Sequence, residues 1–317
     1  MLRDHFHGAS WSAVRELITS GKVTIAGARE LDPGRPVAAG DWVEVRLTAP
    51  RGARGALSPE AVVYLDAELV VVEKPAGVAS VPFEARGEGA RKAPSSAAPR
   101  GDVALSELIA DRLFREARRD APRGDAHARS TLGVVQRLDR ETSGLMVFAR
   151  TPHSKRHLQQ QLRQHSVHRR YLAIAHGDVS DAVYHSRLVQ DRGDGRRGST
   201  LNPTLGRESI THVRRRSALA GATLVECRLE TGRTHQIRIH LAEAGHPLLG
   251  ERVYTKPPPP GSGVPWRRTW ALEELLPAPR VMLHAAELGF IHPRTGRELH
   301  FSSPPPPDFE QCLASLR

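Results

Sequence analysis

Residues 133–150 read GVVQRLDRETSGLMVFAR, and this stretch decides how the rest of the chain is interpreted. Two apolar runs, residues 134–135 and 145–149, flank a polar segment that ends in Thr-Ser-Gly at residues 142–144. An apolar run, a turn and a second apolar run are typical of two strands that meet at a tight connection. We therefore expect two strands here, with the polar segment as their connection.

The connection carries a single aspartate, Asp139, between Arg137 and Arg140. In an extended segment Arg137 and Asp139 point to the same face and Arg140 to the other. A nearby guanidinium favours the ionised carboxylate, so Asp139 should be charged near neutral pH and able to act as a nucleophile or a base. On these residues alone, a routine Arg–Asp pair at the surface end of a strand is the simpler interpretation. The rest of the chain decides between the two.

The chain is strongly basic. Its 317 residues include 46 Lys and Arg against 35 Asp and Glu, a formal net charge of +11, and the pI is about 10.5. Such a balance favours a polyanionic partner, because contacts with phosphates release counterions. The alternative is a genome-wide bias toward Arg, Ala, Gly and Pro. Charge alone does not separate RNA from DNA.

Several classes of protein are excluded by composition. Hydrophobic residues make up 39% of the chain and form no long apolar run, so we expect no transmembrane helix and no membrane partner. The start, MLRDHFHGASWS, lacks the apolar core of an export signal. Two cysteines, Cys227 and Cys312, cannot form a disulfide framework. We expect a cytoplasmic monomer in which both thiols are reduced.

Common catalytic motifs are missing from the sequence. It has no HEXXH motif and no paired cysteines, and His235 and His240 would diverge on a helix because they are five residues apart. It has neither a G-x-S-x-G elbow nor a Walker-type phosphate loop. The sequence therefore predicts no metal ligands and no cofactor. What remains is chemistry on a polyanion with Asp139 as the covalent or basic group.

We expect three regions: a small module over residues 1–48, a linker over 49–60, and a catalytic domain over 61–317. In the first region Ser10 can cap a helix that runs to Ile18, and the segments LITSGKVTI and GDWVEV follow. This pattern resembles the small S-four-type RNA-binding module in degenerate form, since its first helix is nearly absent. The alternative is a cap on the main domain.

The catalytic region alternates between strand and helix patterns. Helices are expected over residues 105–117 and 153–165, and a further helix should begin with Thr234 as its N-cap and end at Gly245. His235 and Arg238 should lie one turn apart beside an N-terminus that favours anions. Strands are expected at residues 62–74 (two strands), 167–176, 209–215, 222–229, 281–290 and 298–301.

Four blocks together resemble the RluA-type family of RNA pseudouridine synthases. They are RLDRETSGLMVFAR, the strand containing Arg169-x-Tyr171-Leu172-Ala173, LETGRTHQIRIHLAEAGHPLLGE, and MLHAAELGFIHPRTG with FSSPPPPDF. The blocks occur in the order typical of the family and cover residues 61–309. The resemblance implies an α+β fold, with a largely antiparallel mixed β-sheet and a central cleft.

The resemblance also implies a reaction. Asp139 is the catalytic aspartate, and uracil is released from its ribose, rotates and rejoins through carbon five. The aspartate either attacks the anomeric carbon or removes a proton from the ribose, and the sequence leaves both roles open. The target uridine must leave its stack, which costs a few kcal/mol that contacts in the pocket must recover.

Matching positions imply further roles. Tyr171 stacks on the flipped base and assists the proton step at carbon five, and Arg238 pairs with Asp139. Arg137 fills the gap that the base leaves, and Leu283 lines the pocket. Gln136 stands where the family usually has histidine. The remaining candidates for RNA contact lie in the same block as Arg238: Arg233, His235 and Gln236.

The sequence favours large-subunit ribosomal RNA as the substrate, because an extra N-terminal module accompanies several family members that act on ribosomal RNA. Transfer RNA stays open. The rival from another class is a non-catalytic RNA-binding or ribosome-assembly protein that keeps the fold. The presence of Asp139, Tyr171 and Arg238 together counts against that rival.

Overall fold

The computed structural model describes residues 10–19, 22–25, 28–30, 37, 42–45, 58–82, 103–120, 132–259, 263–264 and 266–317. They belong to two compact units. The larger unit holds residues 59–82 and 104–317, and the smaller unit contains the helix and strands near the N-terminus.

Where the structure describes the smaller unit, it pairs a helix with a three-stranded sheet. Helix α2 (Trp11–Thr19) precedes β1 (Val23–Ile25), β2 (Ala28–Glu30) and β3 (Val43–Val45), and the antiparallel strands lie in the order β2-β1-β3. The Ser10 hydroxyl accepts a hydrogen bond from the Ala13 amide at 3.1 Å, as expected of an N-cap. Val14, Ile18 and Val23 form its core. Strand β2 was not predicted. The expected limits at residues 48 and 60 stay predictions, because residues 46–57 lie outside the described part.

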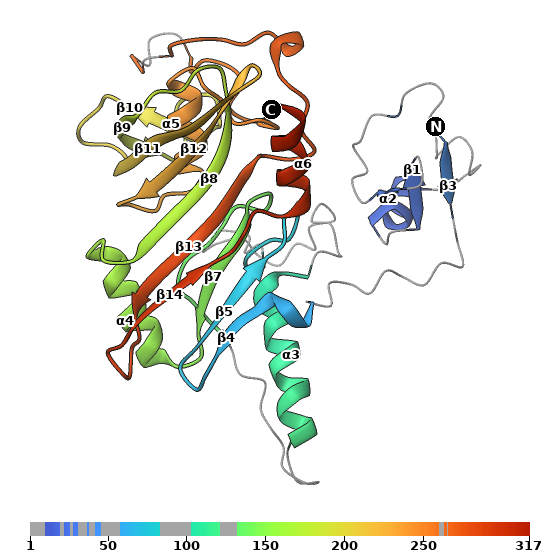
Figure 1. Ribbon diagram of the computed structural model, residues 1–317, viewed down its shortest axis with the longest axis vertical. Coiled ribbons are helices and arrows are strands. Elements are labelled where there is room, and N and C mark those ends of the chain that lie inside the picture. The colour runs from blue at the N-terminus through green and yellow to red at the C-terminus, as the bar shows by residue number, and fades with distance from the viewer. Residues whose placement is uncertain are drawn as a thin grey trace. The chain divides into compact units, whose positions relative to one another are not determined.

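The larger unit is built on one long sheet (Figure 1). Its strands lie in the order β10-β9-β11-β12-β8-β13-β7-β5-β4, with β14 on β13 and β6 on β7. Among the described strands, the pairings are antiparallel except for that of β7 with β13. The strands are β4 (Val62–Leu65), β5 (Leu69–Lys74), β6 (Gly133–Val134), β7 (Ser143–Ala149), β8 (His168–His176), β9 (Ala182–Val189), β10 (Gly198–Thr200), β11 (Arg207–Leu219), β12 (Ala222–Leu229), β13 (Leu283–Ile291) and β14 (Glu298–Ser302).

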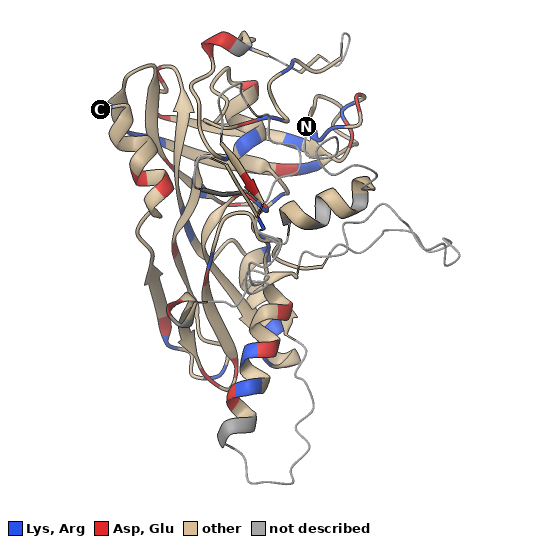
Figure 2. Ribbon diagram, turned by 90° about the vertical axis from the view of Figure 1, so that its right-hand side faces the viewer, with Lys and Arg blue, Asp and Glu red and all other residues tan. Residues whose placement is uncertain are grey.

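In the described part of the larger unit, four helices and two short 3-10 turns accompany this sheet. They are η1 (Pro59–Ala61), α3 (Leu105–Asp120), α4 (Pro152–Arg163), α5 (Gln236–Glu243), η2 (Leu272–Glu274) and α6 (Pro307–Ser315). Figure 2 shows basic and acidic residues alternating along the ribbon of α3. Two pairs of them, four residues apart, are ion pairs: Arg112 with Glu116 and Arg115 with Asp111. Among the described helices, none is both long and apolar enough to cross a membrane.

Two helices cover opposite faces of the sheet. Leu158 of α4 packs into a cluster with Leu145 and Val167, while Phe309 of α6 packs with Ile174 of β8. Val167 and Ile174 are an odd number of residues apart along an extended segment, so their side chains point to opposite faces. We call these the α4 face and the α6 face.

The expected fold class is confirmed: an α+β protein with a largely antiparallel mixed sheet. The strand, turn and strand expected at residues 133–150 are β6, its connection and β7. The sequence missed β9, β10 and α6. In β9 the alternation of apolar and polar residues is weak, because His, Ser and Arg occupy adjacent positions of the strand. Helix α6 begins at the end of a run of prolines, which does not resemble a helix.

Gly144 lies where β7 meets β13 in parallel. Its φ is +109°, and a Cβ atom there would lie 2.3 Å from the Ala285 carbonyl oxygen. Gly144→Ala should therefore lower the free energy of unfolding by more than about 3 kcal/mol, measured by urea denaturation.

The control is Gly296→Ala, in the turn between β13 and β14. Gly296 has a φ of +69°, but nothing lies within 4 Å of the added carbon. This variant should lose only about 1–2 kcal/mol. Equal losses in the two variants would show that the close approach of β7 and β13 does not require glycine.

Candidate active site

Asp139 lies in the connection between β6 and β7, and the segment 74–80 clamps this connection in place. The Arg140 carbonyl accepts hydrogen bonds from Lys74 Nζ at 2.9 Å and from the Gly77 amide at 2.8 Å. The Ser80 hydroxyl donates to the Leu138 carbonyl at 2.6 Å and accepts from the Leu138 amide at 3.1 Å. Both neighbours of Asp139 are therefore fixed through their backbone.

Lys74 is a fully buried cation at this clamp. Its Nζ donates to the carbonyls of Pro75, Val78 and Arg140, each at 2.9 Å. Burial lowers the pKa of Lys74 to about 7, although nearby Asp139 favours the charged form. The lysine thus places a titratable charge beneath the Asp139 connection.

The carboxylate of Asp139 has two side-chain neighbours, an arginine and a histidine. Arg238 Nη1 lies 3.5 Å from Oδ2, and His235 Nε2 lies 3.7 Å from Oδ1. Arg137 is exposed, and Arg140 Nε donates to the Gly77 carbonyl at 2.9 Å. These two contacts with Asp139 therefore come from α5 and the residue before it, and the contact with Arg238 is the pairing that the resemblance implied. Both contacts are long, so the lone pairs of the carboxylate stay accessible to a substrate.

Arg238 is anchored by a second carboxylate. Its Nε and Nη2 donate to Glu251 Oε2 at 2.7 Å and Oε1 at 2.8 Å, which leaves Nη1 for Asp139. Burial raises the pKa of the Glu251 carboxyl, but the hydrogen bond and charge of Arg238, together with the backbone amides of Val253 and Tyr254, outweigh burial and lower that pKa. The amides of Val253 and Tyr254 also donate to Glu251 Oε1. Glu251 thus fixes the plane of the guanidinium.

His235 immediately precedes α5 and adopts a left-handed backbone with φ +60°. Its Nδ1 lies 2.6 Å from the hydroxyl of buried Tyr254. Burial lowers the pKa of His235, so the ring is neutral at neutral pH. If Tyr254 donates to Nδ1, the ring proton sits on Nε2 and faces Asp139. The predicted N-cap, Thr234, was wrong by one residue.

Gln236 begins α5 and is buried. Its Oε1 accepts from the Thr231 hydroxyl at 2.8 Å and the Arg233 amide at 3.0 Å, and its Nε2 donates to the Ile210 carbonyl and the Thr211 hydroxyl. These bonds explain why the helix starts here rather than at Thr234. They also use the side-chain amide of Gln236, which the sequence analysis considered a candidate for RNA contact.

Tyr171 lies on β8 in register with Ala285 of β13, and Leu283 pairs with Ala173 two residues further along β8. Both are buried. Tyr171 is four residues from Val167 and so points to the α4 face, as does Leu283 by register. Burial raises the pKa of the Tyr171 phenol, with a smaller contribution from Asp139. The phenol is therefore protonated at neutral pH and lies near the aspartate.

Arg233 is half-buried, and its Nε donates to the Glu208 carbonyl at 3.2 Å. Arg169, which the sequence did not single out as a site residue, is buried beside Tyr171 and donates to the Glu230 carbonyl at 2.9 Å. Gly232 makes room for it, because a Cβ there would lie 2.6 Å from the Arg169 guanidinium.

Sequence reasoning missed Glu251, Lys74 and Tyr254. Glu251 ends the quoted block LETGRTHQIRIHLAEAGHPLLGE, and Lys74 ends an apolar strand where a lysine would normally be exposed. A charged residue in such an apolar stretch is a usable signal of a buried charge. It does not indicate which charged or polar group contacts that residue in the fold.

Comparisons with known proteins agree on one family. The family described as RNA pseudouridylate synthase matches residues 68–243. Ribosomal large subunit pseudouridine synthase D of Zymomonas mobilis is 34% identical over 96% of this chain and 88% of that protein. The protein of the same name from Xylella fastidiosa is 33% identical over 100% of this chain and 88% of its own length.

Solved structures agree on the fold. Human RNA pseudouridylate synthase domain containing 4 aligns with a TM-score of 0.56 and 20% identity, covering 80% of this chain and 92% of that one. Human RNA pseudouridylate synthase domain containing 1 gives 0.54 and 20%, covering 80% and 86%.

Lys74→Met tests the buried cation at the clamp. Because the pKa of Lys74 is lowered to about 7 in the folded protein, the unfolded chain binds an extra proton above that pH, and stability rises with pH. The free energy of unfolding of the wild type, relative to Lys74→Met, should increase by about 2 kcal/mol between about pH 7 and about pH 9, measured by urea denaturation.

The exposed Lys256 is the matched control, and Lys256→Met should track the wild type across the same pH range. A constant difference between the wild type and Lys74→Met would contradict a titrating lysine at this position.

Proposed function

The chain belongs to the RNA pseudouridylate synthase family, and on this premise we propose that it isomerises specific uridines of large-subunit ribosomal RNA to pseudouridine. The observation that carries the proposal is the setting of Asp139. Its side chain is 19% exposed, with Arg238 and His235 each beside one oxygen and Tyr171 on the same face. The names of the relatives from Zymomonas and Xylella favour ribosomal RNA.

Asp139 acts on the ribose of a uridine that has left its stack. The N1–C1′ bond breaks, uracil turns, and a C5–C1′ bond forms, after which C5 loses a proton and N1 carries one. As a nucleophile the carboxylate bonds C1′ and is then displaced, and as a base it takes a proton from C2′ and returns it. The two long contacts of its oxygens suit either role.

Tyr171 is the group placed to meet the uracil. A buried, protonated phenol offers an aromatic face for stacking and a hydroxyl for the proton step at C5. Leu283 on the same face supplies an apolar wall. Arg238 neutralises Asp139 before the reaction and thereby lowers the cost of bringing a phosphate-rich strand to a carboxylate.

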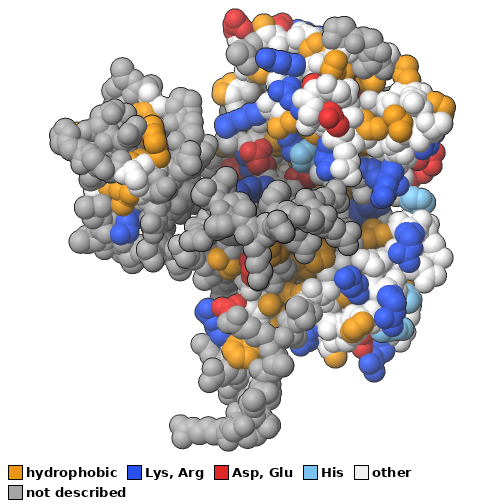
Figure 3. Space-filling view, turned by 180° about the vertical axis from the view of Figure 1, so that it is seen from behind, with side chains coloured by type: hydrophobic (Ala, Val, Ile, Leu, Met, Phe, Trp, Pro, Cys, Tyr) orange, Lys and Arg blue, Asp and Glu red, His pale blue; other side chains and the backbone are white. Residues whose placement is uncertain are grey.

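RNA contact rests on the exposed cations. Arg137 adjoins Asp139 and is free to occupy the gap left by the base, while half-buried Arg233 flanks the start of α5. Figure 3 shows Lys and Arg side chains on both the upper and lower parts of the larger unit. The net charge of +11 supports docking led by phosphates. For His235 and Gln236 we propose structural roles, positioning Asp139 and α5 respectively.

The N-terminal helix and three-stranded sheet support a small RNA-binding module ahead of the catalytic domain. We further propose that the protein acts as a cytoplasmic monomer, in line with the two buried free thiols at Cys227 and Cys312. The rival, a non-catalytic RNA-binding protein, has no observation in its favour at Asp139, where the charged partner Arg238 is in place.

Asp139→Asn tests the reaction. The amide cannot act as a nucleophile or a base, so turnover on a large-subunit ribosomal RNA transcript should fall at least about a hundredfold. Binding of the same transcript should stay within about threefold, because the contacts with phosphates are unchanged. Pseudouridine is measured by carbodiimide modification and primer-extension stops.

Asp178→Asn is the matched control, since Asp178 is exposed and pairs with Arg215. It should retain full activity. If the wild type produced stops on transfer RNA alone, transfer RNA would be the substrate instead of ribosomal RNA. If it produced no stops on any RNA tested, the non-catalytic rival would be favoured.

Glu251→Gln tests how Arg238 is held. The neutral amide loses the paired charge and one acceptor, so the guanidinium is free to turn toward Asp139. Turnover should fall by at least about tenfold, or about 1.4 kcal/mol, with little change in KM. Glu310→Gln, on the exposed side of α6, should match the wild type. A rise in KM alone would instead assign Glu251 to RNA binding.

A further inference from the structure

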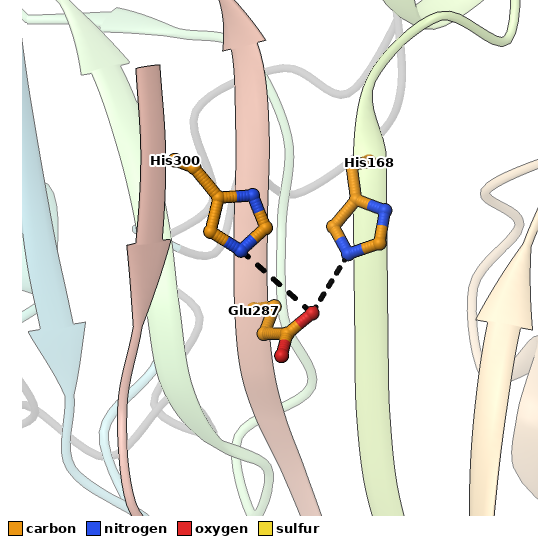
Figure 4. A group of neighbouring side chains, drawn as sticks. All are labelled: His168, Glu287 and His300. Carbon is orange, nitrogen blue, oxygen red and sulfur yellow. Dashed lines mark hydrogen bonds and ion pairs between the residues drawn. The ribbon is translucent and has the colours of Figure 1, made fainter.

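Two histidines and a glutamate converge at a place that the proposed reaction does not use. His168 of β8, Glu287 of β13 and His300 of β14 each offer one ligand atom, and these three atoms lie within 4.8 Å of one another. His168 Nε2 is 2.8 Å and His300 Nε2 3.8 Å from Glu287 Oε2. Figure 4 shows both rings directed toward this carboxylate.

The register of three strands builds the cluster. His168 pairs with Gly289, and Gly289 pairs in turn with His300, so the two histidines flank a residue without a side chain. A Cβ on Gly289 would lie 3.1 Å from His300 Nδ1 and 3.2 Å from His168 Cβ. The glycine therefore opens the space in which the rings approach, with centroids 5.1 Å apart. Glu287, two residues earlier on β13, points to the same side.

The cluster lies on the α6 face. His168 is six residues from Ile174, which packs against α6, and three residues from Tyr171, which points to the α4 face. The site therefore lies on the opposite face of β8 from Tyr171, the residue proposed to meet the uracil. Both histidines are partly open to solvent, with side chains 35% and 52% exposed.

A neighbouring arginine orients the carboxylate. Arg170 Nη2 pairs with Glu287 Oε1, which leaves Oε2 turned toward the imidazoles. Arg170 also contacts Glu226 at 3.3 Å, so part of its charge is already compensated. The pairing with Arg170 thus leaves one oxygen of Glu287 free to act as a metal ligand.

We propose that His168, His300 and Glu287 form a binding site for a divalent transition metal of the zinc class. Two imidazole nitrogens and one carboxylate oxygen are a three-ligand zinc set, with water as the fourth ligand. Ligands about 2.0–2.1 Å from the metal lie about 3.3 Å apart in a tetrahedron. The distances of 2.8 and 3.8 Å to Oε2 bracket that value, so small rotations of the rings complete the geometry.

Metal at this site joins three strands through their side chains. Because the metal binds the folded sheet and not the unfolded chain, it stabilises the fold. It takes no part in the reaction, since Asp139 and Tyr171 lie on the α4 face. The sequence predicted no metal ligands because His168 and Glu287 are 119 residues apart and share no motif.

The test uses the full chain after treatment with a chelator, titrated with zinc chloride in a calorimeter. The wild type should bind one more zinc ion per chain than the double variant His168→Ala/His300→Ala. Glu287→Gln, which keeps the size of the side chain, should weaken the same binding at least about tenfold. Cobalt should give visible absorption in the wild type that the double variant lacks.

The matched control is His185→Ala. His185 pairs with Glu208 at 2.9 Å in an exposed pair with a single histidine, so this variant should bind zinc like the wild type. Asp139→Asn should also bind zinc normally, which separates this proposal from the proposed reaction. Circular dichroism identifies any variant that does not fold.

Equal zinc stoichiometry and affinity in the wild type, the double variant and Glu287→Gln would overturn the proposal. The absence of saturable zinc binding to the wild type would also overturn it. The cluster would then be a group of ion pairs with no metal-binding role.

Discussion

The short parallel contact between β7 and β13 is the constraint on which the candidate active site depends. In the described strand order, these two strands join the part of the sheet that contains β4 and β5 to the part that contains β8 to β12. Asp139 enters from the first part, five residues before Gly144. Arg238, His235 and Tyr171 come from the second part. The backbones meet so closely at Gly144 and Ala285 that no side chain fits between them. A slip of one residue at this contact would move Asp139 by about 3.3 Å relative to its partners.

The charged residues around Asp139 hold it in place without occupying all the hydrogen-bonding positions of its carboxylate oxygens. Arg238 makes its two short hydrogen bonds to buried Glu251, and only a 3.5 Å contact to Asp139. Burying the pair of Arg238 and Glu251 costs desolvation free energy. Such a pair fixes the orientation of the guanidinium more than it stabilises the fold. Lys74 beneath the connection adds a cation that binds backbone carbonyls rather than the aspartate itself. The carboxylate is thus fixed through its neighbours and stays partly exposed.

The two faces of β8 serve separate purposes because side chains alternate along a strand. Arg169 and Tyr171 point to the α4 face with Asp139, whereas His168 and Arg170 point to the α6 face beside Glu287. A ligand on the α6 face can stiffen β8 and β13 without touching the substrate. Gly289 contributes on that face by lacking a side chain, much as Gly144 does where β7 meets β13.

The sequence by itself determined what depends on neighbours along the chain. Turn chemistry and alternation placed β6, β7, β12 and the hairpin of β13 and β14. The motif blocks identified the family and singled out Asp139, Tyr171 and Arg238 as candidate site residues. Only the tertiary structure showed that Glu251 holds Arg238, that Lys74 lies beneath the Asp139 connection, that Gln236 is turned inward, and that His168 meets Glu287. Local patterns follow from the period of a strand or helix, so they can be read from sequence. These contacts depend on the register between strands that are far apart in the sequence and on burial. No local sequence pattern shows which charged residues, far apart along the chain, come into contact.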